Sequence, residues 1–428
     1  MNTKKFIALF TLPFIFSTSY AIQATLLHVD CTKADIFVEN ENCAQQLSVV
    51  LKNAKTGEIL NQQIAKLPQQ KLSFANLSQD TEYQYQVLDT QNKVEVNGKF
   101  KTAPDYKDRT PPPDFSFAVL GSSYVNDKPF DVPFRTNGSE YEIFNAVAKA
   151  KPNFVVWANG ADTLRPADMG SQEAMTYRFS KSRKVAEAQN VLNNFANYGV
   201  MANQAFGDKN ADKFSPTAKN AKATFKKFWS IPQSNDDALY YCFSYSDTDF
   251  FVLDTCSQRS NLDYKEYMPE ILGKKQLQWL MANLNNSTAK FKIIVVNSPL
   301  TNPVKSKAHF TFAEKERKAI LDFLVLKKIT GVVVVSANKD FSEITRFVRA
   351  GGYPLHEATV GAFTNRPAKE VSEMNYFRVP NSAITVRSFM LVKIDGAEND
   401  RRISMSFINS KGEQLFNLTL KESELRGQ

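Results

Sequence analysis

Hydrophobic and polar residues alternate along short segments between Ile22 and about Pro104. ADIFVE, LSVVLKN and YQYQVLD all have this two-residue period, and turn residues such as those of Lys55-Thr56-Gly57 separate the segments. Alternation of this kind is typical of strands that bury one face. Residues 22–104 are therefore predicted to form a small β-sandwich.

A proline-rich stretch, DYKDRTPPPD, follows at residues 105–114. Three consecutive prolines are excluded from the interior of a helix or a sheet, because each lacks a backbone N–H. Such a sequence favours an extended, semi-rigid spacer. We therefore expect residues 105–113 to link two domains.

From residue 114 onwards, apolar strand patterns alternate with helical ones. FSFAVLGSS, FVVWANG, KFKIIVVNS and GVVVVS have the composition of buried strands, whereas GKKQLQWLMANLNNS has helical spacing. This alternation predicts an α/β domain over residues 114–428. The C-terminal segments ITVRSFMLVKIDG and RRISMSFINSKGEQLFNLTL alternate instead and predict antiparallel strands, with a hairpin turn at Ser410-Lys411-Gly412.

The first 21 residues have the pattern of a secretory signal peptide. Two lysines precede an apolar run from Phe6 to Phe16, and small residues follow near Ala21. The mature chain is expected to begin near Ile22 and to be exported, to a periplasm or to the extracellular space. No later stretch approaches ~20 uninterrupted apolar residues, so no transmembrane anchor is predicted.

Length and charge change this picture only slightly. A chain of 428 residues with 43% hydrophobic residues exceeds what one core usually supports, which agrees with two domains. The net charge is +9, and removal of Lys4 and Lys5 with the signal peptide would leave +7. The basic residues are scattered along the chain, so nucleic-acid binding is not expected.

The four cysteines are predicted to pair according to their spacing. In an exported protein, Cys31 with Cys43 and Cys242 with Cys256 would each close a short loop. The alternative for Cys242, inside YYCFSYS, is that of a small buried residue. Neither pair has the spacing of a zinc site.

The loops that follow the strands are the expected place for function, because open α/β sheets bind ligands beyond the carboxyl ends of their strands. These loops are rich in Gly, Ala, Ser and Asn and poor in catalytic residue types. In chain order they read LGSSYVND, WANGADTLR, MANQAFGDKNADK, VVNSPLTNP, VSANKDFSE and ATVGAFTN.

Several short sequence segments resemble segments of one known family. They are FKKFWSIP, FSYSDTDFFVLD, LGKKQLQWL, FKIIVVNSP, the run from Lys328 to Val335, FSEITR and GYPLHEAT. Together with the order of elements, they resemble the alkaline phosphatase D family of calcineurin-like metallophosphatases. FANLSQDTEYQYQVLD and GKFKTAP in turn resemble the end of a fibronectin type III-like domain. The resemblance implies such a domain followed by a four-layer α/β/β/α sandwich, two metal ions and hydrolysis of phosphate esters.

The first two metal-ligand motifs implied by this family are altered here. The family's cysteine or aspartate after Gly-Ser corresponds to Ser123. Its Gly-Asp-Asn falls on Asn159, Gly160 and Ala161, so the bridging aspartate becomes Gly160.

Two further motifs are altered in the same way. The family's Trp-Asp-Asp-His-Asp falls on residues 201–205, which places Ala202, Asn203 and Gln204 where ligands and the catalytic histidine would be. Its Gly-Asp-Arg-His-Phe-Ser falls on residues 337–342, which places Asn338 at the aspartate and Asp340 at the histidine. The resemblance therefore implies a family site whose ligands are lost, and no cofactor is predicted.

The histidine count supports this prediction without reference to any family. A dinuclear phosphatase site needs several imidazoles and carboxylates around two metals about 3.5 to 4 Å apart. The chain has only His28, His309 and His356, and none has a histidine partner at metal-binding spacing. A histidine-rich metal site is not expected, and His356 is interpreted as a packing residue.

Carboxylates offer one alternative site, for a hard cation such as magnesium or calcium. The candidates are Asp162, Asp208, Asp212 and Asp340. Their spacing fits no recognised oxygen-ligand loop, so we interpret them as turn and cap residues.

A catalytic triad is the other alternative. Ser122 or Ser123 with His356 and an aspartate would supply the side chains, but neither serine lies in a Gly-x-Ser-x-Gly elbow. Small residues at a strand end more often serve packing.

These observations favour an exported pseudo-phosphatase that binds an anionic ligand or a protein partner. Arg165 and Lys339 are the candidate anion contacts. One alternative is a metal-dependent phosphomonoesterase or phosphodiesterase with a rearranged site of Asp162, Asn203, Asn338 and Asp340 around one metal. The other alternative is a two-domain periplasmic or surface interaction module.

Overall fold

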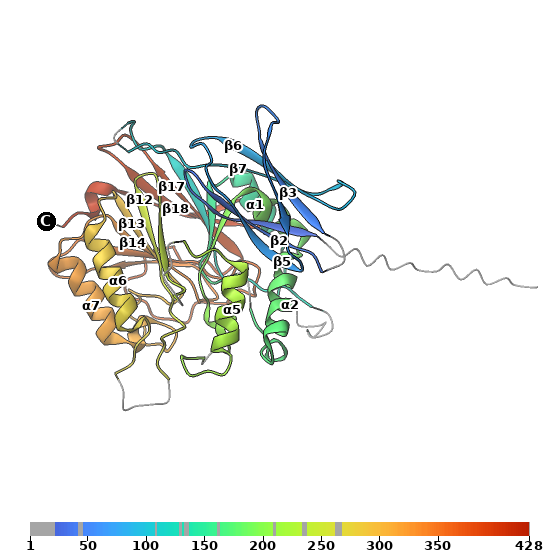
Figure 1. Cartoon of the computed structure of the whole chain (residues 1–428). Helices are drawn as coiled ribbons and strands as arrows, with labels where there is room; N and C mark the ends of the chain where they lie inside the picture. The colour runs from blue at the N-terminus through green and yellow to red at the C-terminus, as the bar shows by residue number, and fades with distance from the viewer. Residues whose placement is uncertain are drawn as a thin grey trace, which may run out of the picture.

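The N-terminal part of the chain forms two packed β-sheets. The computed structural model describes residues 22–427 except 42–45, 108, 128–130, 132–136, 161–162, 209–210, 233–237 and 262–267. One sheet has the strand order β1-β2-β5 and the other has the order β4-β3-β6-β7 (Figure 1). The predicted β-sandwich is confirmed. Its strands are β1 (Gln23–Val29), β2 (Ala34–Glu39), β3 (Leu47–Asn53), β4 (Ile59–Ala65), β5 (Gln69–Phe74), β6 (Glu82–Leu88) and β7 (Val94–Lys101).

The rest of the chain contains two further six-stranded sheets. The first has the order β10-β9-β8-β17-β18-β19, in which β8, β9 and β10 are parallel and the remaining strands are antiparallel. Its strands are β8 (Phe115–Leu120), β9 (Phe154–Trp157), β10 (Ala196–Gly199), β17 (Ser388–Asp395), β18 (Arg402–Asn409) and β19 (Gln414–Lys421). The predicted C-terminal hairpin is the pair β18–β19.

The second sheet has the order β11-β12-β13-β14-β16-β15, with four parallel strands between antiparallel edges. Its strands are β11 (Tyr241–Tyr245), β12 (Thr248–Val252), β13 (Phe291–Val296), β14 (Val332–Ser336), β15 (Glu343–Phe347) and β16 (Leu355–Thr359). The apolar runs of β13 and β14 are wholly buried, as their composition predicts.

Helices flank these sheets on different sides. Helices α6 and α7 run beside each other next to β12, β13 and β14, while α2 and α5 form a separate pair (Figure 1). None of the described helices is long and apolar enough to cross a bilayer. The helices are α1 (Ile143–Ala150), α2 (Gln172–Arg183), α3 (Gln189–Asn194), α4 (Asn203–Phe206), α5 (Ala218–Phe228), α6 (Gly273–Asn286) and α7 (Glu314–Leu326). Short 3₁₀ turns lie at Pro166–Asp168, Ala186–Ala188, Phe310–Phe312 and Glu422–Leu425.

Aromatic side chains pack the two six-stranded sheets against each other. Phe117 of β8 and Phe154 of β9 meet Phe250 of β12 edge to face, with ring centroids 5.1 and 5.3 Å apart. This geometry is favourable for aromatic pairs beyond the area they bury. It also aligns the two sheets, so that their strand-end loops converge.

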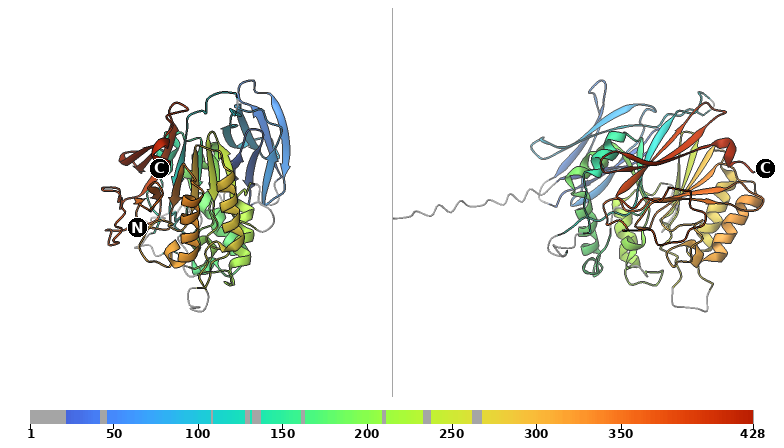
Figure 2. Two further views of the ribbon diagram at one scale, coloured as in Figure 1. Left: turned by 90° about the vertical axis from the view of Figure 1, so that its left-hand side faces the viewer. Right: turned by 180° about the vertical axis from the view of Figure 1, so that it is seen from behind.

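The β-sandwich is joined closely to the α/β part (Figure 2). Tyr198 of β10 donates a hydrogen bond of 3.2 Å to the backbone oxygen of Val29, at the end of β1. Tyr85 of β6 donates one of 3.0 Å to the backbone oxygen of Asn193 in α3. Both phenol groups are buried. Buried hydrogen bonds therefore connect the β-sandwich to the α/β part of the chain.

Candidate functional site

The strand-end loops of both six-stranded sheets meet at one end of the molecule. Ser122, which follows β8, donates its backbone N–H to the backbone oxygen of Gly361 at 2.8 Å. Ala337, which follows β14, donates its backbone N–H to the backbone oxygen of Asn297 at 3.3 Å. A β-carbon on Gly121 would lie 1.9 Å from the oxygen of Gly361, so this close approach requires glycine.

Three buried polar side chains are hydrogen-bonded in series at this point. Asn159, which follows β9, donates to the hydroxyl oxygen of Ser122 at 2.6 Å. Asn297, which follows β13, donates to the side-chain oxygen of Asn159 at 2.5 Å and to the backbone oxygen of Ala158 at 3.2 Å. All three side chains are buried, and Asn297 is fully so. Two sheets are thus connected by uncharged groups.

The series continues into the loop that begins α4. The backbone N–H of Asn203 donates to the side-chain oxygen of Asn297 at 3.4 Å. The thiol of Cys256 donates to the side-chain oxygen of Asn203 at 3.2 Å. Burial raises the pKa of Cys256, so this thiol stays protonated. We call these five residues, Ser122, Asn159, Asn203, Cys256 and Asn297, the neutral network.

The neutral network does not fit a dinuclear metal centre. Such a centre needs carboxylates and imidazoles, which compensate the charge of two divalent ions. Here the donors are hydroxyl, amide and protonated thiol groups, and they satisfy one another. Within the described ranges, no three or more His, Cys, Asp or Glu side chains are grouped closely enough to hold a metal ion.

The other substituted family positions lie around this network without joining it. Ser123 is buried, its backbone oxygen accepts a hydrogen bond of 2.7 Å from Thr163, and its hydroxyl has no hydrogen-bond partner in the described structure. Gly160 has a φ of +60°, which places it in the left-handed region. Ala202 is buried beside Asn203.

Three more of the substituted family positions, Gln204, Asn338 and Asp340, also lie outside the network. Gln204 accepts a backbone hydrogen bond of 2.8 Å from Leu164. Asn338 is half-buried and left-handed, with a φ of +63°. Asp340 is exposed, and its backbone oxygen accepts from Ala368 at 2.8 Å. Asp162 and Ala161 lie outside the described residues.

Arg165 uses its charge within the fold. It donates two hydrogen bonds of 2.8 Å to the carboxylate of Asp168 and lies 3.5 Å from Asp127. These hydrogen bonds raise the pKa of Arg165. An anion would have to compete with Asp168 for this buried guanidinium.

Lys339 is engaged in the same manner. Its ammonium lies 2.6 Å from Glu343 and 2.5 Å from Glu373, and Arg378 completes the cluster through a 2.6 Å hydrogen bond to Glu343. Burial opposes the ionisation of Glu343, but Lys339 and Arg378 more than offset this effect and lower its pKa. Neither predicted anion contact therefore presents a vacant cation.

The remaining carboxylate candidates do not converge with Asp340 either. Asp212 accepts a hydrogen bond of 2.7 Å from the backbone N–H of Phe214 and one of 2.7 Å from the side chain of Asn261. Asp208 accepts one of 3.0 Å at its backbone oxygen from Ala211. Their interpretation as turn residues agrees with these contacts.

The three histidines lie in separate parts of the fold. His28 is on β1, His309 precedes the 3₁₀ turn at Phe310–Phe312, and His356 is on β16. His309 contacts the backbone oxygen of Val304 at 3.1 Å. His356 is buried, and burial lowers its pKa to about 4. Ser122 and Ser123 have no histidine partner among their described hydrogen bonds.

The predicted Cys242–Cys256 disulfide is not formed, and the predicted Cys31–Cys43 pair includes a residue outside the described part of the chain. Cys31, Cys242 and Cys256 form no disulfide, and Cys43 lies outside the described residues. Cys242 stands opposite Phe251 in the β11–β12 ladder, and Cys256 lies five residues further along the chain. Cys256 lies beyond the end of β12 at Val252, and its thiol donates to Asn203 instead.

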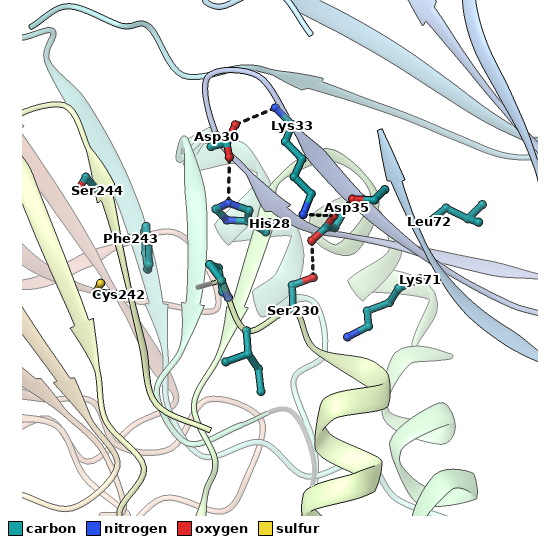
Figure 3. A pocket seen from close by; sticks show the side chains of 13 residues that line it. His28, Asp30, Lys33, Asp35, Lys71, Leu72, Ser230, Cys242, Phe243 and Ser244 are labelled. Atoms are coloured by element: carbon teal, nitrogen blue, oxygen red, sulfur yellow. Dashed lines mark hydrogen bonds and ion pairs between the residues drawn. The ribbon is translucent and has the colours of Figure 1, made fainter. Parts of the chain in front are cut away.

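A polar cleft that sequence reasoning missed lies where the sandwich meets β11. Its volume is about 620 Å³, and Figure 3 shows charged residues of β1, β2 and the turn between them along it. His28 lies 3.4 Å from Asp30 and 3.2 Å from the hydroxyl of Tyr198. Partial burial opposes the ionisation of Asp30, but hydrogen bonds from His28 and nearby backbone groups lower its pKa to about 2.

The other charges of this cleft are also held by neighbours. Asp35 accepts hydrogen bonds from Ser73 at 2.6 Å and from Ser230 at 2.9 Å, and Lys33 lies 3.4 Å from it. Lys71 donates to the backbone oxygens at the end of α5. The run of charges in DCTKAD is the only sequence signal for this cleft, which offers both signs of charge to a polar ligand.

Comparison with known proteins agrees with this fold. The family model described as PhoD-like phosphatase matches residues 190–375. Alkaline phosphatase D of Bacillus subtilis (strain 168) is 24% identical over 296 residues, which cover 59% of this chain and 50% of that protein. Over these residues, this chain is similar to proteins of the alkaline phosphatase D family. It spans about half the length of its Bacillus relative.

Solved structures extend the PhoD-like fold over nearly the whole chain. A structure of PhoD matches with a TM-score of 0.75 at 14% identity and covers 96% of this chain and 92% of that one. The purple acid phosphatase PPD1 of yellow lupin (Lupinus luteus) matches with a TM-score of 0.65 at 10% identity and covers 93% and 74%. Identities this low show a shared fold. The neutral network lies in loops of that fold.

Proposed function

We propose that this PhoD-like chain is an exported protein that has lost phosphatase activity and acts by binding. The observation that carries the proposal is the neutral network, in which Asn159, Asn297 and Asn203 bond to one another, to Ser122 and to Cys256. Metal ligands packed this closely would be anionic and would repel one another without their ions. Amide groups instead stabilise one another directly.

The proposal includes the four-layer α/β/β/α order expected of the family. It also includes cleavage of a signal peptide before Ile22 and the fibronectin type III-like character of residues 22–104. The bound species is an anionic ligand or a protein. Because Arg165 and Lys339 already face carboxylates, we favour a protein.

Metal content and turnover test the proposal together. The purified mature protein is incubated with iron, zinc, manganese, calcium or magnesium, desalted and submitted to elemental analysis and to a generic phosphate-ester assay. Alkaline phosphatase D of Bacillus subtilis, treated identically, is the positive control. We expect no stoichiometric metal and no turnover above the blank.

A phosphoesterase with rearranged ligands would give the opposite result. Stoichiometric metal with turnover that is lost in Asp340→Ala or Asp162→Ala would refute the proposal. Asp322→Ala, which removes an exposed carboxylate on α7, is the matched control and should leave any turnover unchanged.

A further inference from the structure

The edge strand β4 is unusually open for a natural sheet edge. Its sequence, ILNQQIA, has no charged residue and no proline. Ile59, Leu60 and Ile64 are 59%, 45% and 58% exposed. Exposed apolar edge strands are sites at which another strand can add, and native proteins usually protect them with charge, proline or a covering element.

The opposite edge of the same sheet has that protection. Strand β7, VEVNGKFK, has charges such as Glu95 and Lys99 along its length. Helix α3 packs beside it, and Asn194 accepts a hydrogen bond of 3.1 Å from the backbone N–H of Lys99. The edge at β7 is therefore charged and covered by a helix, whereas the edge at β4 is uncharged. A β-bulge near Leu60 is the protective feature that β4 does show.

The outer face of β4 is defined by its pairing with β3. Gln62 stands opposite Val50 and Ile64 opposite Ser48, and the side chain of Gln62 donates to Ser48 at 2.6 Å. Gln63 faces the other way and donates to the backbone oxygen of Ser73 in β5 at 2.9 Å. In the described part of the chain, only β3 and β5 pack extensively against β4.

We propose that β4 pairs antiparallel with β4 of a second copy of this chain, with the two-fold axis at Gln62. The segment LNQQI has the same chemical order in both directions around Gln62. Leu60 would lie opposite Ile64 of the partner subunit, and Asn61 opposite Gln63 of the partner subunit. Apolar and amide cross-strand pairs of this kind stabilise antiparallel strands, and a two-fold contact must be self-complementary.

This symmetry favours a second copy over an unrelated strand. Without Lys4 and Lys5 of the signal peptide the net charge is +7, so two copies repel each other over most of their surface. At β4 they would meet through a neutral strand. A single pair of short strands buries little area, so the expected dissociation constant is about 1 to 100 µM.

Sedimentation velocity over a concentration series measures the oligomeric state of the wild type and of charge variants at Gln62, which test the proposed pairing. Gln62→Lys and Gln62→Glu each place like charges opposite each other in the dimer, and each variant alone should be monomeric. An equimolar mixture of the two should dimerise, because Lys then faces Glu. Val94→Lys, on the protected edge and 45% exposed in the wild type, should remain dimeric.

Several results would overturn this inference. A wild-type protein that is monomeric throughout the series excludes a second copy as the occupant of β4. A dimer that survives both Gln62 variants uses another surface. Variants that fail to recombine, although their thermal unfolding matches the wild type, exclude the proposed register. None of these results depends on metal content or turnover.

Discussion

The side-chain amide of Asn297 lies between two carbonyl oxygens, at 2.5 Å from that of Asn159 and 3.2 Å from that of Ala158. Its own side-chain oxygen accepts from the backbone of Asn203. One fully buried asparagine thus bridges the strand ends of both six-stranded sheets. Its amide nitrogen supplies donors that no carboxylate could replace.

Asn297→Asp should therefore destabilise the protein by about 3 kcal/mol or more at pH 7. One oxygen of the new carboxylate would face two carbonyl oxygens in a fully buried position, and the backbone N–H of Asn203 would be its remaining donor. The free energy of unfolding from urea titration measures the effect. Asn338→Asp makes the same chemical change in a half-buried loop outside the network and should cost less than about 0.5 kcal/mol. Equal effects of the two variants would contradict the importance of the neutral network.

The thiol of Cys256 should be unreactive in the native protein. It is buried and donates to Asn203, and burial raises its pKa, so little thiolate is available at pH 8. Alkylation by iodoacetamide followed by peptide mass spectrometry should label Cys31 and Cys242 slowly and Cys256 only after denaturation. A Cys242–Cys256 linked peptide in a non-reduced digest would contradict the structure.

The sequence was sufficient to predict the strands and the loops that follow them. Buried-strand patterns place Ser122, Asn159 and Asn203 in loops after strands, and the structure shows that these loops meet. Asn297 was interpreted as part of the segment FKIIVVNSP, which carries the family resemblance, rather than as part of the site. Asparagines that follow three separate strands were a signal of the network, since amides that meet in a buried place bond to one another.

Long-range partners could not be predicted in this way. Lys339 pairs with Glu343 at a short spacing, but its second partner, Glu373, comes from a distant loop. The prediction of a Cys242–Cys256 disulfide failed because sequence spacing does not fix the register of a hairpin. The turn after Tyr245 sets Cys242 opposite Phe251, and only the hairpin geometry excludes the bond.

Removal of Lys339 should be costly because it leaves buried carboxylates without their cation. Glu343 is fully buried, and Lys339→Met removes one of its two ion-pair partners. We expect a loss of about 3 to 5 kcal/mol in the free energy of unfolding at pH 7. Lys318→Met removes a Lys–Asp322 pair of the same i,i+4 spacing whose side chains are largely exposed, and should cost far less. Similar losses in both variants would show that the buried cluster contributes no more than a surface pair.

Protonation of His356 should make the protein less stable in mild acid. Its Nδ1 atom is buried without a hydrogen-bond partner in the described structure, and it stands opposite Arg346 in the β15–β16 ladder. Burial, and then the charge of Arg346, lower its pKa to about 4, against about 6.5 in an unfolded chain. Between these two values, the unfolded state binds a proton that the folded state does not. Stability is therefore unaffected above about pH 6.5 and falls as the pH decreases towards 4.

The share of this loss that belongs to His356 is of order 3 kcal/mol, from about 2.5 pKa units at 1.36 kcal/mol each. His356→Leu removes the titrating group, while every carboxylate of the fold remains as background. Urea titrations of both proteins at pH 7 and pH 4.5 give the difference in the free energy of unfolding at each pH. We expect the variant to gain about 2 to 3 kcal/mol relative to the wild type when the pH is lowered, because only the wild type must keep a histidine neutral there. An identical difference at both pH values would mean that His356 binds its proton equally well in the folded and unfolded chains.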